Sequence, residues 1–313
     1  MYKYILKRLV LLIPVIIGVS LLVFSIMDIA EGDPVYQIVS ETASEEVIEA
    51  TREAYGLNDP FLVRYARYMI NLCKGSMGTS YITKQDVFKT YMELLPNTVK
   101  LSLLAVVIAI VVSIPLGINA AIHQNTWADT GSMFTSLLFV SMPQFWLGLL
   151  LMLAFALKLG WFPSGGNEDG LKSLILPAFT VGIGLAALMT RTTRSSMLET
   201  IRQDYITTAK AKGVSNKNAI YHHAFKNALI PIVTVGGMQL AQVLGGSVLA
   251  ETVFSYPGVG RLIVQSIERR DIPMVTGALI LTTIIVSVVN LATDIVYAFI
   301  DPRVKAQYKK GGT

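Results

Sequence analysis

Cysteine and charge are both scarce in this chain of 313 residues. Cys73 is its only cysteine, so neither an intrachain disulfide nor a cluster of thiolate metal ligands can form. We interpret Cys73 as a packing residue. Charged residues make up 15% of the chain and hydrophobic residues 53%, a balance too apolar for the surface of an ordinary water-soluble protein.

The motifs of common catalytic and nucleotide-binding sites are also missing. Without a Gly-x-x-x-x-Gly-Lys-Ser/Thr loop the chain cannot bind ATP by that route, so any energy must come from a partner or a gradient. Neither His-Glu-x-x-His nor Gly-x-Ser-x-Gly occurs, and the adjacent His222 and His223 fall on different sides of a helix. We therefore expect no catalytic residue, no metal site and no cofactor bound by this chain itself.

Long apolar runs dominate what is present. A helix needs roughly 20 apolar residues to cross a hydrocarbon core about 30 Å thick, and six runs are long enough. They predict an all-α integral membrane protein with six transmembrane helices. The basic start of the chain resembles a signal peptide, but the first run is too long and lacks a cleavage site, so we expect it to be retained. The predicted spans are Leu9–Ala30, Thr98–Ile122, Ser132–Leu157, Ser173–Thr190, Leu229–Ala250 and Met274–Ile300.

Only three ionisable residues fall within these limits. Asp28 and Lys100 lie next to the end of a span, where a side chain can reach water. Asp294 lies deeper and follows Asn290 by one helical turn. We favour a polar contact between helices over a transport role for Asp294. Asp28 lies at the outer end of its span and Asp294 nearer the inner end, so the two carboxylates should not meet.

Basic residues predict the orientation, because Lys and Arg accumulate in short cytoplasmic loops. Three precede the first span, seven lie between 191 and 228, and four lie in the C-terminal tail. This bias places both termini in the cytoplasm (N-in/C-in). It also accounts for the net charge of +5, so we expect membrane lipid and no nucleic acid as a partner. The opposite loops hold Lys158, Lys172, Arg261, Arg269 and Arg270.

The domain organisation follows from the spans. Residues 1–97 comprise the first span and an outer cap segment with two amphipathic helical stretches, separated by Asn58-Asp59-Pro60, the first capped by Thr42 or Ser44. Residues 98–302 form the five-span core, and 303–313 are a cytoplasmic tail. In the last outer loop, Pro257-Gly258-Val259-Gly260 predicts a turn, and apolar residues at helical spacing after it predict a short helix.

The most specific motif lies in the long inner segment 191–228. It reads Tyr-Ile-Thr-Thr-Ala-Lys-Ala-Lys-Gly from Tyr205 to Gly213, and His-Ala-Phe-Lys-Asn-Ala follows from His223. These residues resemble the inner-membrane permeases of binding-protein-dependent ABC importers, in particular the dipeptide, oligopeptide and nickel branch, and the B-type permease of the pair. The family pattern is Glu-Ala-Ala, three residues, Gly, nine residues, then Ile-x-Leu-Pro.

Ala209 and Gly213 match that pattern, whereas Thr207 and Thr208 replace the Glu and the first Ala. In the second half of the motif, His223, Phe225 and Lys226 replace the Ile, Leu and Pro of the family pattern. These departures resemble the version of the motif found in the peptide and nickel branch. The resemblance extends over nearly the whole chain through further matching stretches: Gly32-Asp33-Pro34, Ser141-Met142-Pro143, Arg194-Ser195-Ser196-Met197-Leu198, Glu251-Thr252-Val253-Phe254, Pro257-Gly258-Val259-Gly260 and Asp301-Pro302-Arg303.

The resemblance implies a type I ABC importer permease fold and a defined set of partners. These are a homologous second permease, two ABC ATPase subunits that bind the ATP, and an extracytoplasmic solute-binding protein. It also implies that a short coupling helix docks on the ATPase. The coupling residues are Thr207, Thr208, Ala209, Lys210, Ala211, Lys212 and Gly213.

The residues fit that role physically. Small side chains at Ala209, Ala211 and Gly213 permit close approach of a partner, and Gly213 allows the backbone to turn after the helix. We expect Gly213 to separate one helix that ends at Lys212 from a second over Asn216–Asn227.

The substrate stays open on sequence grounds. The branch transports dipeptides, longer peptides, glutathione and chelated nickel, and we favour peptides because the spans hold no cluster of His or Cys for a metal. The residues that contact substrate are unknown. A gradient-driven transporter would show inverted repeats and mid-membrane charges, and a membrane enzyme would need a convergent polar constellation; neither pattern is evident.

The predicted orientation can be tested by labelling with a membrane-impermeant thiol reagent in a Cys73→Ser background. Ser215→Cys should react only from the cytoplasmic side, and Ser44→Cys only from outside, because the basic segment containing Ser215 should stay inside. The reverse labelling pattern would refute the topology.

Overall fold

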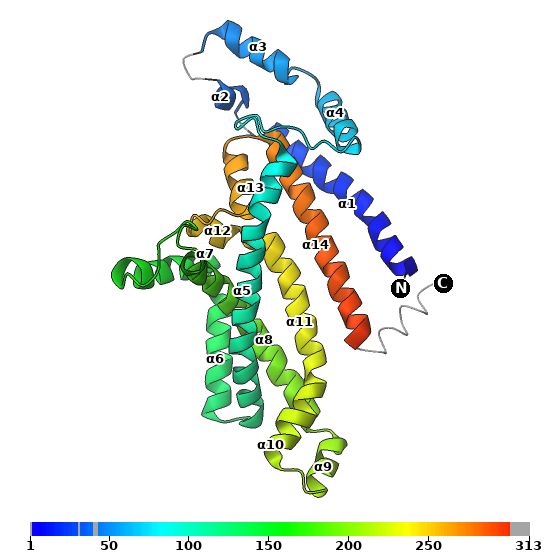
Figure 1. Ribbon diagram of the computed structural model, residues 1–313, viewed down its shortest axis with the longest axis vertical. Coiled ribbons are helices and arrows are strands. Elements are labelled where there is room, and N and C mark those ends of the chain that lie inside the picture. The colour runs from blue at the N-terminus through cyan, green and yellow to red at the C-terminus, as the bar shows by residue number, and fades with distance from the viewer. Residues whose placement is uncertain (1, 31, 40–42, 301–313) are drawn as a thin grey trace. The chain divides into compact units, whose positions relative to one another are not determined.

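The computed structural model describes residues 2–30, 32–39 and 43–300 (Figure 1). Regular structure in these ranges is helical, apart from one antiparallel bridge between Thr79 and Asp86, so the predicted all-α class is confirmed. The expected cap residue Thr42, the motif 301–303 and the tail 303–313 lie outside the described residues.

In the described part of the chain, five helices are long and apolar enough to cross a membrane. In each, the internal hydrogen bonds of the helix satisfy the backbone groups that lipid cannot. The helices are α1 (Tyr2–Ile29), α5 (Val87–Ile122), α8 (Leu171–Ile201), α11 (Phe225–Gly246) and α14 (Ile272–Ile300). With the bent pair described next as one broken span, the count reaches the six predicted.

The third span is not the single straight helix expected over Ser132–Leu157. It consists of α6 (Trp127–Ser141) followed by α7 (Gln144–Leu151) with a π-helical continuation η1 (Met152–Lys158), and the two parts are bent by 101°. Pro143 explains the break. It has no N–H to donate, and it favours an extended residue before it, which Met142 provides at φ −74° and ψ 130°.

Three other helix limits also differ from the prediction. α8 continues to Ile201, past the predicted end of its span at Thr190. The second inner helix does not end at Asn227: α10 (Asn216–Asn218) and the π-helical η2 (Ala219–Ala224) run directly into α11. α11 ends at Gly246, and α12 (Val248–Val253) follows a turn at Ser247. Because polar residues continue the helix past the apolar run, apolar length alone underestimates the inner ends of α8 and α11, whereas it overestimates the outer end of α11.

The chain divides into two compact units, which we describe separately. One contains residues 2–98 and 257–287, and the other contains 99–256 and 288–300 of the described chain. The first unit therefore combines the N-terminal part with the last outer loop. The boundaries at 97/98 and 302/303 taken from the sequence stay a prediction.

In the first unit, the outer segment folds into α2 (Val35–Ile38), α3 (Glu45–Tyr55) and α4 (Phe61–Cys73), so both amphipathic helices are confirmed. α3 ends at Gly56 in the left-handed conformation. Phe24 of α1 packs against Phe61, Tyr65 and Tyr68 of α4 with ring centroids 5.7–6.0 Å apart. Asp28 is exposed, as expected, and it also pairs with Arg64, which joins the same two helices.

The last outer loop contains α13 (Val259–Glu268), the short helix predicted after the Pro-Gly turn. Its first backbone N–H, on Val259, donates to Thr98 Oγ1 at 2.9 Å. Buried Asp271 accepts hydrogen bonds from Ser80 Oγ and from the backbone N–H of Tyr81, which fixes the loop before α5 at the start of α14. Burial first, and then the charge of Asp271, raises the pKa of the Tyr81 phenol.

In the second unit α8 is the central helix and packs against α6, α7 and α11. Glycine permits two of its close contacts. A Cβ at Gly182 would lie 2.8 Å from the backbone oxygen of Ala105, and a Cβ at Gly117 would lie 2.9 Å from that of Thr190. Such small residues let helices approach closely where lipid supplies no hydrophobic driving force. α8 is thereby held by neighbours on several sides, which positions the site at its inner end.

Candidate functional site

The predicted coupling segment forms helix α9 (Asp204–Ala211), and two residues separate it from the end of α8 at Ile201. Gln203 is extended at φ −76° and ψ 145°, so the chain leaves the line of α8 there. The Gln203 backbone oxygen then accepts from Ile206 N at 3.0 Å and starts the new helix. Asp204 in the first turn complements the positive end of the helix dipole.

Gly213 ends this helix in a Schellman motif. Its φ is +88°, its N–H donates to Lys210 O at 3.0 Å, and Val214 N donates to Ala209 O at 3.1 Å. The positive φ expected at Gly213 is thus present. The helix itself ends at Ala211, with Lys212 as its cap, one residue earlier than predicted.

The predicted coupling residues point outward around one buried side chain, Ile206. Thr207, Thr208, Lys210, Ala211, Lys212 and Gly213 are exposed, and Ala209 is half-buried. Between them and the rest of the unit lies Ile206, which is only 1% exposed and belongs to the same apolar cluster as Ala219 and Ile220 of η2. Burying a side chain of this size contributes about 1.5–3 kcal/mol. The sequence motif includes Ile206, but the residue was not singled out, because a single apolar position in a short helix gives no periodic signal.

Polar contacts fix α9 to α11 as well. Tyr205 Oη accepts a hydrogen bond from Asn227 Nδ2 at 2.8 Å. In the segment that follows α9, Ser215 Oγ caps α10 by accepting from Asn218 N at 3.3 Å.

Beside Tyr205 and Asn227 a cavity of about 440 Å³ opens between the end of α8 and the start of α11. It is lined by Ser196, Glu199, Thr200, Gln203, Tyr205, Asn227, Ala228, Ile230 and Pro231. Tyr205 is the α9 residue that lines this cavity, and the predicted coupling residues 207–213 are not part of its lining.

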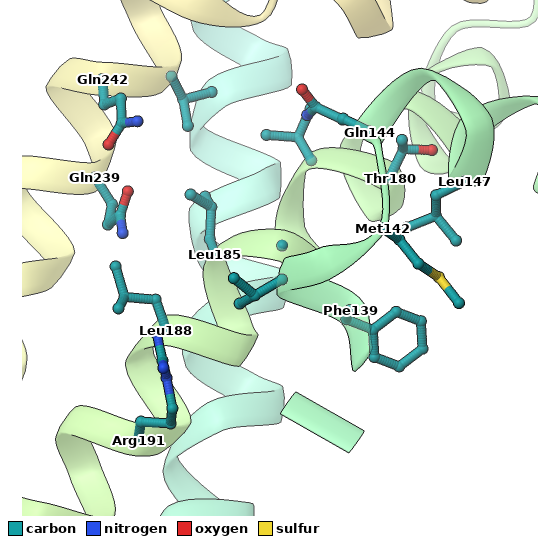
Figure 2. A pocket seen from close by; sticks show the side chains of 14 residues that line it. Phe139, Met142, Gln144, Leu147, Thr180, Leu185, Leu188, Arg191, Gln239 and Gln242 are labelled. Atoms are coloured by element: carbon teal, nitrogen blue, oxygen red, sulfur yellow. The ribbon is translucent and has the colours of Figure 1, made fainter. Parts of the chain in front are cut away.

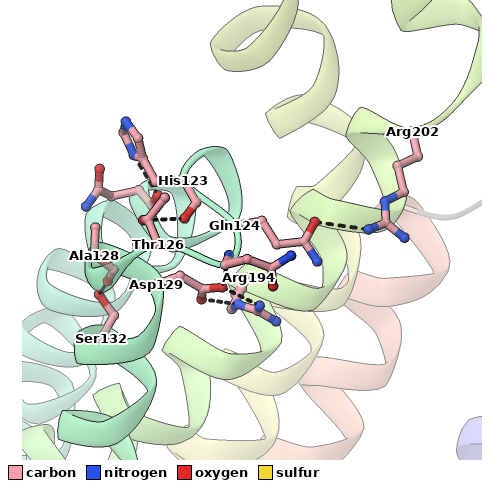
Figure 3. Close-up of polar contacts among 10 residues, drawn as sticks. His123, Gln124, Thr126, Ala128, Asp129, Ser132, Arg194 and Arg202 are labelled. Atoms are coloured by element: carbon pink, nitrogen blue, oxygen red, sulfur yellow. Dashed lines mark hydrogen bonds and ion pairs between the residues drawn. The ribbon is translucent and has the colours of Figure 1, made fainter.

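An ion pair connects α6 to the inner half of α8 (Figure 3). Arg194 binds Asp129 with both nitrogens of its fork, Nε to Oδ1 at 2.5 Å and Nη2 to Oδ2 at 2.7 Å. Asp129 is 4% exposed and also accepts from Asn125 N at 3.0 Å. Bidentate pairing satisfies the carboxylate and defines the angle between the helices.

Arg202 Nη2 donates a 3.0 Å hydrogen bond to Oε1 of Gln124, which lies in the turn before α6. Arg194 appeared in the sequence as part of a basic segment, and its partner was missed. The available signal was Asp129 itself, an acidic residue directly before an apolar run.

A second cavity, of about 370 Å³, lies among α6, α7, α8 and α11 (Figure 2). Its walls are largely apolar, but Gln144, Arg191, Gln239 and Gln242 contribute polar side chains. Sequence reasoning missed the three glutamines, because a glutamine in an apolar helix carries no motif.

Three further sequence expectations concern metal ligands, the adjacent histidines and Asp294. Among the described residues no group of three or more His, Cys, Asp or Glu side chains is placed to hold a metal, and the rings of His222 and His223 lie edge to face 5.3 Å apart. Asp294 is half-buried on α14, and its contact with Asn290 stays a prediction.

Comparison with known families decides the class of protein. The family model described as "Binding-protein-dependent transport system inner membrane component" matches residues 113–306, and its N-terminal counterpart matches residues 1–102. The chain belongs to this family. The resemblance seen at the coupling motif is thus confirmed over nearly the full length.

Curated relatives extend over the same length. The chain is 40% identical to the dipeptide transport system permease protein DppB of Alkalihalophilus pseudofirmus, over 97% of this chain and 100% of that one. It is 39% identical to the oligopeptide transport system permease protein AppB of Bacillus subtilis, with the same coverage. It is 37% identical to the glutathione transport system permease protein GsiC of Salmonella paratyphi A, over 97% and 99%.

The fold also matches a solved transporter. A chain of the inward-facing MetNI methionine ABC transporter superimposes with a TM-score of 0.58 at 19% identity, covering 68% of this chain and 96% of that chain. This likeness concerns the fold alone and confirms the predicted type I permease architecture. Together with the family and the apolar helices, it identifies a multi-pass protein of the cytoplasmic membrane.

The Schellman turn gives a direct test of the coupling segment. Gly213→Val should cost about 1–2 kcal/mol at this turn, because a side chain disfavours positive φ, although no described atom lies within 4 Å of a Cβ built there. We expect near-normal amounts in the membrane but reduced binding-protein-stimulated ATP hydrolysis by the purified complex. Gly213→Asn is the control, since Asn tolerates this conformation. Normal assembly, hydrolysis and uptake in Gly213→Val would show that Gly213 is only a loop residue.

Proposed function

We propose that this protein is the membrane permease subunit through which an ABC importer moves short peptides into the cell. The observation that carries the proposal is the full-length similarity to permeases named for dipeptide, oligopeptide and di/tripeptide transport, at 37–40% identity. Glutathione, itself a tripeptide, is the second candidate because GsiC is similar over the same length. A nickel chelate remains the weaker alternative.

The proposed complex contains a homologous second permease, two ABC ATPase subunits and an extracytoplasmic solute-binding protein. Two features of the chain support a need for partners. Its coupling residues are exposed around a buried anchor, and large apolar side chains such as Leu22, Val111 and Phe134 are exposed along helices that can face lipid or a second permease.

In this proposal the chain catalyses no reaction and binds no ATP. Hydrolysis takes place in the ATPase subunits, and their closure displaces α9. Because Ile206 and Tyr205 fix α9 to η2 and α11, and only two residues join it to α8, its displacement would move the inner ends of both long helices. Residues Thr207 to Gly213 would transmit the movement, and the route between the two permeases would open alternately to each side.

Uptake by the reconstituted complex tests the function. We expect a labelled dipeptide to accumulate only when the binding protein and active ATPases are both present, and an ATPase variant that binds but does not hydrolyse ATP should abolish accumulation. The matched control is the same vesicle with an ion gradient and no ATP. Accumulation driven by that gradient would contradict the importer mechanism, and ATP-driven transport of nickel but not of peptides would contradict the peptide substrate.

A further inference from the structure

The 370 Å³ cavity has the features of a ligand site rather than of a packing defect. Its size falls within the range of about 300–1,000 Å³ typical of small-molecule pockets. Apolar side chains such as Leu185, Leu188 and Val243 form most of its wall. Besides Thr180, whose hydroxyl donates to Leu176 O, four polar side chains from three helices line it: Gln144 at the start of α7, Arg191 on α8, and Gln239 and Gln242 on α11.

Figure 2 shows how these side chains lie. Gln239 and Gln242 project from α11 on one side of the cavity, and Gln144 lies across from them at the bend between α6 and α7. Gln239 and Gln242 are three residues apart, so they stand on one face of their helix. The bend at Pro143, which the sequence did not predict as a right-angled break, is what brings Gln144 to the cavity.

None of the four polar side chains forms a hydrogen bond or ion pair with another residue in the described part of the chain. Gln239 is only 6% exposed, and its amide has no protein partner in the described part of the chain, so the space in the cavity is where it can form hydrogen bonds. A ligand in the cavity can replace solvent there and supply these hydrogen bonds.

Arg191 supplies the only charge among the residues that line the cavity. Its neighbour one turn along α8, Arg194, is already neutralised by both oxygens of Asp129, whereas Arg191 has no acidic partner among the described residues. An arginine fork binds a carboxylate through two parallel hydrogen bonds, and glutamine amides both donate to and accept from peptide groups. A free divalent cation would be repelled by the same charge.

We propose that this cavity is a carboxylate-binding subsite of the transport route, in which Arg191 holds the C-terminal carboxylate of a short peptide and Gln144, Gln239 and Gln242 hydrogen-bond its amides. The assignment rests on the proposed peptide transport and specifies which end of the substrate the permease recognises. Among the described residues that line the cavity none is acidic, so the N-terminal ammonium is not selected here.

The test compares dialanine with its C-terminal amide in proteoliposomes that contain the whole complex. Each compound is supplied at a concentration that saturates the binding protein, so that differences in affinity for that protein do not enter the rates. The parent should import dialanine at least about tenfold faster than the amide, the size expected for a hydrogen bond to a charged group. Arg191→Gln should remove this preference, and Arg191→Lys should restore part of it.

Lys172→Gln is the matched control, because it removes a cation from the other end of α8, outside the cavity. It should keep the preference of the parent. Equal slowing of both compounds by Arg191→Gln, with the ratio unchanged, would overturn the subsite while leaving peptide transport intact. Failure of the parent to import either compound, in vesicles that hydrolyse ATP on addition of the loaded binding protein, would overturn the proposed function and the subsite together.

Discussion

Backbone hydrogen bonding constrains this structure more than any single side-chain contact. In an apolar bilayer each N–H and C=O must find its partner within the protein, so the chain crosses as helices and can change direction only where the backbone is otherwise satisfied. The break before α7 uses Pro143, which has no N–H to satisfy, and the turn after α9 uses the two Schellman hydrogen bonds around Gly213. Both breaks stand beside a candidate functional feature, the polar cavity in one case and the coupling helix in the other.

The same helices connect these two features. α8 carries Arg191 at the cavity and is joined to α9 by two residues, and α11 carries Gln239 and contacts α9 through Asn227. The Asp129–Arg194 pair holds α6 against the stretch of α8 between them. A movement of α9 would therefore reach the cavity through rigid, hydrogen-bonded helices, which is the kind of connection that coupling between distant sites needs.

Much of the fold could be predicted because local sequence patterns indicate it: long apolar runs indicate the membrane spans, and apolar residues at helical spacing indicate the cap helices. Gly213 was also predictable, since a turn at positive φ favours glycine. The bend of 101° was not, because Ser141-Met142-Pro143 signals an interruption without fixing its angle. Nor was the Asp129–Arg194 pair, which joins residues 65 apart in the chain. The cavity glutamines were missed for the same reason: their convergence depends on tertiary packing, which no local pattern encodes.

The central claim is that α9 is the surface through which ATP hydrolysis drives this permease, and a photocrosslinking measurement tests it most directly. A Thr208→Cys variant in a Cys73→Ser background would carry a benzophenone maleimide on the exposed face of α9, with Ser44→Cys on the outer cap as control. In the intact complex, irradiation should join the label at Thr208→Cys to an ATPase subunit, and the label at Ser44→Cys should not react with that subunit. Absence of an ATPase crosslink from Thr208→Cys in a complex that contains the ATPases and hydrolyses ATP would contradict the account.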